Sequence, residues 1–147
     1  MILEINPHQS VGGILFGASQ EAVGRVLGDN FTVFVRNPNV PYKEHAYDEL
    51  GVYVSFDRAM KCNAVLIMKP SDAVLNRKLL LALAAQEAFE VIRSLDSASE
   101  LEGGSLTSAR LGIAVYAPDI EAEPEDPPES VLVFRADYFK WNQATHE

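Results

Sequence analysis

The residues able to do nucleophilic or metal chemistry are few in this sequence and widely spaced. Cys62 is the only cysteine, and the three histidines, His8, His45 and His146, lie in separate stretches of the chain. A Cys–His pair needs the thiol and the imidazole within hydrogen-bond reach, and only the fold could bring Cys62 to His45. No two of these residues have the spacing of metal ligands. The sequence therefore predicts no metal site and no cofactor.

Asp48 and Glu49 are adjacent carboxylates and are the remaining candidates for general acid–base work. Beside the entrance of a strand, such residues are usually just solvated. If a small enzyme or ligand-binding site were assembled from distant residues, Cys62, His45, Asp48 and Glu49 would be its members. No pattern joins these four residues, so we predict no catalytic residue and a protein that is not an enzyme.

A glycine-punctuated stretch, ILFGASQEAVGRVLG at 14–28, raises the question of a phosphate-binding loop. Such loops need glycines at fixed offsets, usually followed by Lys-Ser or Lys-Thr, whereas Gly17 is followed by Ala-Ser-Gln. Ser19 is typical of a helix N-cap, and Gly28 is typical of the position after a helix. The stretch predicts a helix over about residues 19–27 and no nucleotide site.

The strongest signal for binding is a run of acids and prolines, APDIEAEPEDPPES, at 117–130. It contains no basic residue, and its prolines favour an extended loop that loses little entropy on binding. Such a loop can bind a basic cleft with electrostatically steered association, or it can be a solvated loop that its charge keeps from aggregating. We predict partner binding by its six acidic residues, which are Asp119, Glu121, Glu123, Glu125, Asp126 and Glu129.

A second candidate surface is the loop from Arg36 to His45, where Tyr42, and Tyr47 directly after the loop, lie among mixed charges. Tyrosines in exposed loops are common interface anchors, although they also fill cores. Tyr42 and Tyr47 are therefore predicted as partner-binding residues beside the six acids.

Composition and charge limit the classes of partner. The chain has 147 residues and a net charge of −9, which fits one domain over 1–147 that repels nucleic-acid phosphates and anionic membranes. The same charge attracts basic proteins, although acidity can equally serve solubility alone. The most apolar run, at 79–85, is too short to span a bilayer, and the N-terminus has no signal-peptide pattern. We expect a cytoplasmic protein with a protein partner and with no nucleic-acid or membrane ligand.

Three short blocks recur along the chain in the same order, two of them 66 positions later and one 61 positions later. The paired blocks are QEAV at 20–23 and QEAF at 86–89, LGVYV at 50–54 and LGIAV at 111–115, and VLIMK at 65–69 and VLVFR at 131–135. Repetition in a fixed order indicates an internal duplication. We place the first copy at about 11–70 and the second at about 73–136, followed by a tail at 137–147.

Each copy is predicted as a helix followed by three strands, which makes an α+β fold with both helices on one face of an antiparallel sheet. The predicted helices cover about 19–27 and 73–95. The predicted strands are 31–35, 51–56 and 63–68 in the first copy, and 105–108, 111–116 and 131–135 in the second.

The pattern FG-x-S-x-x-x-V-x-x-x-LG at 16–28, with the later LG-[VI]-x-V strands, resembles a group of small bacterial proteins. Many of these are uncharacterised, and some are immunity proteins that neutralise a toxin made by the same cell. The layout is also distantly similar to the β-lactamase inhibitor protein, which has two repeats and blocks an enzyme with loops on its sheet. The resemblance covers roughly 11–70 and 79–135 and implies an α+β fold and inhibitory binding. It assigns no role to any single residue.

Two non-catalytic functions therefore stand beside the small-enzyme alternative. The first is an immunity or inhibitor protein that neutralises a basic bacterial toxin or enzyme. The alternative is a structural or regulatory interaction module without a toxin partner, which includes a homodimer joined at a sheet edge.

Overall fold

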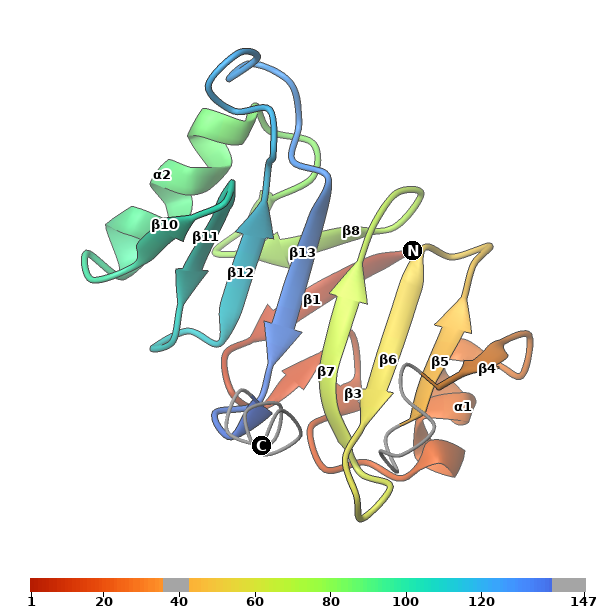
Figure 1. The fold of residues 1–147 in the computed structure, drawn as a ribbon. Helices are drawn as coiled ribbons and strands as arrows, with labels where there is room; N and C mark the ends of the chain where they lie inside the picture. Colours follow the sequence, from red (N-terminus) through yellow and green to blue (C-terminus); the bar gives the residue numbers. More distant parts are fainter. Residues whose placement is uncertain (36–42, 139–147) are drawn as a thin grey trace.

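The computed structural model describes residues 1–35 and 43–138, which form an α+β fold dominated by strands (Figure 1). These residues build an eight-stranded antiparallel sheet, a five-stranded mixed sheet and two helices. The elements of the first half are β1 (Ile2–Asn6), β2 (Ser10–Val11), β3 (Ile14–Leu15), α1 (Gln20–Leu27), β4 (Thr32–Phe34), β5 (Lys43–Tyr47), β6 (Val52–Phe56) and β7 (Cys62–Ile67). Those of the second half are β8 (Asp72–Leu75), β9 (Lys78–Leu79), α2 (Ala85–Leu95), β10 (Glu100–Glu102), β11 (Ser105–Ser108), β12 (Ile113–Tyr116) and β13 (Ser130–Phe134).

Both sheets are built from both halves of the chain. The large sheet has the order β10-β11-β12-β13-β7-β6-β5-β4, so the halves meet at the antiparallel pair β13 and β7, where Leu132 lies opposite Leu66. The small sheet has the order β3-β2-β1-β8-β9, and here the halves meet at the parallel pair β1 and β8. Each half of the chain therefore contributes strands to both sheets, and neither half forms a complete sheet alone.

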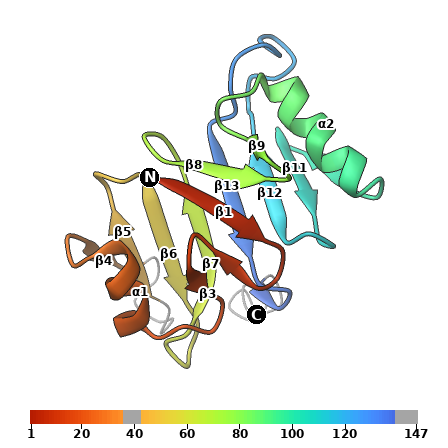
Figure 2. The same cartoon turned by 180° about the vertical axis from the view of Figure 1, so that it is seen from behind.

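The core lies between the large sheet and a layer made of the small sheet and the helices. Seen from behind, α1, α2 and the small sheet all lie on the same side of the large sheet (Figure 2). Alternate residues of β6 point into this core, namely Val52, Val54 and Phe56, and they meet Leu3 of β1 in one buried cluster. The opposite layer contributes Phe89 of α2 to the same cluster.

Helix α1 forms where its local signals predicted it. The Ser19 hydroxyl accepts a hydrogen bond from the Ala22 amide at 3.1 Å, and Gly28 ends the helix with a φ of 92°. Val23 and Leu27 are buried on one face of the helix. The prediction of a helix over about 19–27 is confirmed.

The predicted long helix at 73–95 is wrong over its first half. The structure has a hairpin of β8 and β9 there, whose turn residues Asn76 and Arg77 have φ values of 50° and 66°. Consecutive left-handed residues cannot continue a right-handed helix. The apolar run that suggested a helix is explained by burial, because Leu80 and Leu81 enter the core directly after β9.

The predicted unit of one helix and three strands also differs from the structure. Four strands follow each helix, β4 to β7 after α1 and β10 to β13 after α2, and a hairpin precedes each helix. The strand β5 occupies part of a stretch that was expected to be a loop, and β10 was not expected. Of the predicted tail at 137–147, residues 139–147 lie outside the described part of the chain, and His146 with them.

Candidate partner-binding surface

The acidic segment forms the long connection between β12 and β13, at the top of Figure 1. All six of its carboxylate side chains are exposed, while Ala117 and Pro128 near its two ends are buried. The loop therefore presents all of its acids to solvent and is anchored near its two ends by buried residues.

Backbone hydrogen bonds fix this loop against α2. Ala84, the residue before the helix, gives no side-chain cap. Instead, the Ala85 amide donates to the Asp126 carbonyl at 2.8 Å, and the Gln86 amide donates to the Pro124 carbonyl at 3.1 Å. The loop thus supplies acceptors for two amides that a helix start would otherwise leave free. A loop held in this way presents its carboxylates from a defined backbone.

The carboxylates at the centre of the loop are crowded. The Glu123 amide donates to the Asp119 carbonyl at 2.7 Å, and the Asp126 amide donates to the Glu123 carbonyl at 3.2 Å. A hydrogen bond with the Asp126 carboxyl, together with the charges of Asp126 and Asp119, raises the pKa of Glu123. Like charges held close together favour any state that adds a positive charge, either a proton or a basic side chain.

The two predicted tyrosines have different positions. Tyr42 lies outside the described residues. The Tyr47 side chain is 1 % exposed, and its hydroxyl donates to the Gly28 carbonyl at the end of α1 at 3.0 Å. A ring that holds a strand to a helix end in the core is not accessible to a partner, so Tyr47 has no place in the surface proposed below.

The four candidate catalytic residues do not form a group. His45 of β5 and Cys62 of β7 are separated by β6, which places their strands on the order of 10 Å apart. Cys62 is 0 % exposed, and desolvation raises the pKa of its thiol to about 12. The exposed Glu49 accepts a hydrogen bond from the Asn30 side chain at 3.1 Å, and the exposed Asp48 hydrogen-bonds Tyr53.

His45 itself is packed as a core aromatic residue. Its ring stacks on Phe31 with 4.1 Å between the centroids, and its centroid lies 4.7 Å from that of Phe56. Desolvation lowers the pKa of His45, and the charge of Lys43 lowers it further. The imidazole is therefore neutral and enclosed, which suits packing better than proton transfer to a substrate.

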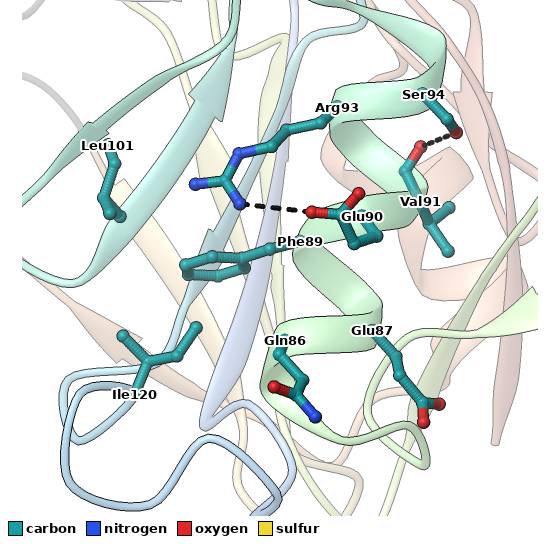
Figure 3. Close-up of a pocket in the computed structure, with 9 residues that line it drawn as sticks. All are labelled: Gln86, Glu87, Phe89, Glu90, Val91, Arg93, Ser94, Leu101 and Ile120. Carbon is teal, nitrogen blue, oxygen red and sulfur yellow. Dashed lines mark hydrogen bonds and ion pairs between the residues drawn. The ribbon is translucent and has the colours of Figure 1, made fainter.

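A groove that the sequence did not suggest runs along α2, with a volume of about 620 Å³. The helix supplies one wall, Leu101 of β10 faces it, and Ile120 of the acidic loop closes one end (Figure 3). The Arg93 guanidinium lies over the Phe89 ring at 5.7 Å from its centroid. The available signal was Leu101 itself, an apolar residue between two glutamates in a stretch assigned to no strand.

The described part of the chain contains no group of three or more His, Cys, Asp or Glu residues arranged to hold a metal ion. It also contains no helix with the length and apolar character needed to cross a membrane.

No family model, no curated protein and no solved structure matches this chain.

Proposed function

We propose that this protein is a non-catalytic binding protein of the immunity or inhibitor type, which neutralises a basic bacterial toxin or enzyme. One observation carries the proposal: six exposed carboxylates lie on a loop whose backbone is fixed to the start of α2. A fixed acidic surface loses little conformational entropy on binding, and its field accelerates association with a basic cleft.

The chemistry of the described residues supports binding over catalysis. The candidate nucleophile, Cys62, is buried with a pKa of about 12, and the candidate base, His45, is enclosed by aromatic rings. Neither side chain could approach a substrate without opening the core. The acidic loop, in contrast, combines charge and exposure with a backbone that is hydrogen-bonded to α2.

We also propose that the chain arose by duplication of a hairpin, a helix and four strands. The pairing of Leu66 with Leu132 supports this, because these residues are 66 positions apart, which is the offset of two of the three sequence blocks. An equal offset at the meeting point of β7 and β13 is the arrangement expected of two copies related by a twofold axis.

The turns before β6 and β12 support the same duplication. Gly51 and Gly112 both have a positive φ, of 70° and 68°. The Gly51 carbonyl accepts from the Met68 amide at 2.7 Å, and the Gly112 carbonyl accepts from the Phe134 amide at 2.8 Å. The two copies differ most between their last two strands, where residues 57–61 form a short turn in one and residues 117–129 form the acidic loop in the other. The proposed binding surface is thus the feature that distinguishes the copies.

The proposal is tested by capture from the lysate of the native host at low and at moderate salt. We expect one stoichiometric basic partner, whose retention falls as salt rises. The variant Asp119→Lys/Glu123→Lys/Asp126→Lys should abolish retention. The matched control, Glu4→Lys/Glu21→Lys/Asp29→Lys, makes the same change in net charge at exposed positions elsewhere and should retain the partner. Equal binding by both variants would refute the acidic surface.

A homodimeric interaction module is the alternative, and one observation favours it. Strand β4 is at the end of the large sheet, and its Val33 and Phe34 side chains are 50 % and 52 % exposed. An exposed apolar edge is a ready site for pairing with a second copy. Sedimentation equilibrium decides between the two, because a monomer at all concentrations excludes the dimer.

A further inference from the structure

We infer that the groove between α2 and β10 binds an extended peptide of alternating basic and apolar side chains, which adds to the large sheet beside β10. This inference rests on the proposed function for the existence of a protein partner, and it specifies which segment of such a partner is held.

The backbone of β10 is available for pairing. β10 is the terminal strand of the large sheet and pairs with β11 on one side. Within residues 1–35 and 43–138, no strand pairs with its other side. The outer amides and carbonyls of such a strand can bind an extended peptide by β-addition, which gives affinity through the main chain.

The side chains of the groove fit an apolar residue of that peptide. Leu101 is opposite the fully buried Leu106, so it points to the core side of the sheet, yet it is 50 % exposed because no strand covers it. Across the groove lie Phe89 and the half-buried Ile120 (Figure 3). A residue that faces Leu101 from an added strand would enter this space and cover Leu101 and Ile120, beside the already buried Phe89 ring.

The opposite face of β10 carries charge. Glu100 and Glu102 flank Leu101, and because successive side chains alternate, both point to the other face of the sheet. In an added strand, the residues opposite these glutamates would lie on that face too. Opposite-charge pairs across strands are favourable, so lysine or arginine is expected at these two places. The required pattern is therefore basic, apolar, basic.

The surroundings strengthen the preference for a basic peptide. Glu87 and Glu90 line the groove, and the acidic loop borders it through Ile120. The one basic side chain of the lining, Arg93, already pairs with Glu90 at 3.4 Å. The groove and its rim thus have a net negative charge that a basic peptide would offset.

A second copy of this chain is a poorer occupant. If two β10 strands paired with each other, their glutamates would lie opposite or diagonal to glutamates of the other copy. The β4 edge offers no alternative site for a basic peptide, because its residues Thr32, Val33 and Phe34 carry no acid. Of the two edge strands of the large sheet, β10 alone therefore presents the alternating pattern.

The test uses the full chain and the peptide acetyl-Lys-Leu-Lys-Leu-Lys-amide, followed by fluorescence anisotropy and by amide chemical shifts. Two control peptides are used, one with the same residues as separate Leu and Lys blocks and one with Glu in place of Lys. We expect saturable shifts at β10 and α2 with the alternating peptide and binding at least about tenfold weaker for both controls.

Variants of the protein complete the test. Leu101→Lys should weaken binding about tenfold, whereas Leu15→Lys, at an exposed leucine of β3 in the other sheet, should leave it unchanged. The double variant Glu100→Lys/Glu102→Lys should reverse the preference and favour the Glu-Leu peptide. Because all these side chains are exposed, each variant is expected to keep the native amide spectrum, which serves as the check of folding.

The inference is overturned if the shifts map to β4, if the block peptide binds equally, or if the charge reversal does not change the preferred peptide. The failure of the proposed function has a different signature. In that case no basic partner depends on Asp119, Glu123 and Asp126, while the alternating peptide still binds at β10. The reverse result, a partner that needs those acids and a peptide that does not bind, refutes only the groove.

Discussion

At the scale of single residues, the chemistry of this protein depends on burial. Cys62 and His45 are reactive residue types, but the strands that carry them direct both side chains into the core. Tyr47 is buried as well, and its hydroxyl links β5 to the end of α1. The acids of the loop are the opposite case, because all six are exposed among the described residues. Residue type alone did not show which of these side chains a partner or substrate can reach, whereas their burial in the structure does.

Cys62 should be unreactive in the folded protein. Since its pKa is about 12, almost no thiolate exists near neutral pH, and the 0 % exposed sulfur is also shielded from reagents. We expect no labelling by iodoacetamide at pH 8 in buffer and complete labelling in concentrated urea, as measured by mass spectrometry. Rapid labelling of the folded protein would contradict the buried position.

Binding to the proposed basic partner should weaken as the pH falls through the raised pKa of Glu123. The folded free protein binds this proton more readily than an isolated glutamate does, because Asp126 and Asp119 are close. A basic partner favours the carboxylate, so protonation and binding oppose each other. Titration calorimetry between pH 4 and 7 should show the loss beginning above the usual pKa of glutamate. In Glu123→Gln this part of the pH dependence should disappear.

At the scale of elements, the sequence predicted a helix end where the capping residues are neighbours of the helix in the chain. Ser19 and Gly28 marked the two ends of α1 in the sequence, and they cap the helix in the structure. The start of α2 had no such signal, because its capping acceptors are backbone carbonyls of residues about 40 positions away. The groove could not be predicted from the sequence either, because Leu101 lines it only through the placement of β10 at the end of the sheet beside α2. Contacts between distant residues through the backbone leave little trace in sequence.

Shortening the acidic loop should therefore destabilise α2. If residues 117–129 are replaced by the short turn of residues 57–61, the Ala85 and Gln86 amides lose their acceptors. We expect a loss of about 1 kcal/mol in the free energy of unfolding for each hydrogen bond, and faster amide exchange in the first turn of α2.

A side-chain cap should compensate for the missing loop. Ala84→Ser in the shortened protein supplies an acceptor at the N-cap and should restore about 1 kcal/mol, as measured by urea unfolding. The same substitution in the full-length loop should have a smaller effect, because the amides are already bonded. Equal effects in both backgrounds would show that the loop does not cap the helix.

At the scale of the whole molecule, the two halves share both sheets. The sequence predicted a duplication and a shared sheet, but it did not predict the second sheet, whose short strands β2, β3 and β9 contain two residues each. Such strands have no periodicity to detect, and they form because β1 and β8 pair across the halves.

Unfolding in urea should accordingly be a single transition. Because β7 pairs with β13 and β1 pairs with β8, neither half can lose its structure without exposing the core of the other. Far-UV circular dichroism and the amide signals of β5 and β12 should report the same midpoint. Two separate midpoints would show that the halves are independent.

The attachment of the acidic loop to α2 has a consequence for how the two surfaces communicate. Helix α2, whose first turn is hydrogen-bonded to the acidic loop, also forms one wall of the groove. Ile120 is part of the acidic loop and lines the groove as well. A partner that tightens the loop would then set the position of the groove, and a peptide in the groove would in turn tighten the loop. Thermodynamic linkage requires the two effects to be equal, so each ligand would raise the affinity for the other by the same factor. A toxin that offered both a basic face and an extended segment would be held more tightly than either contact alone could explain.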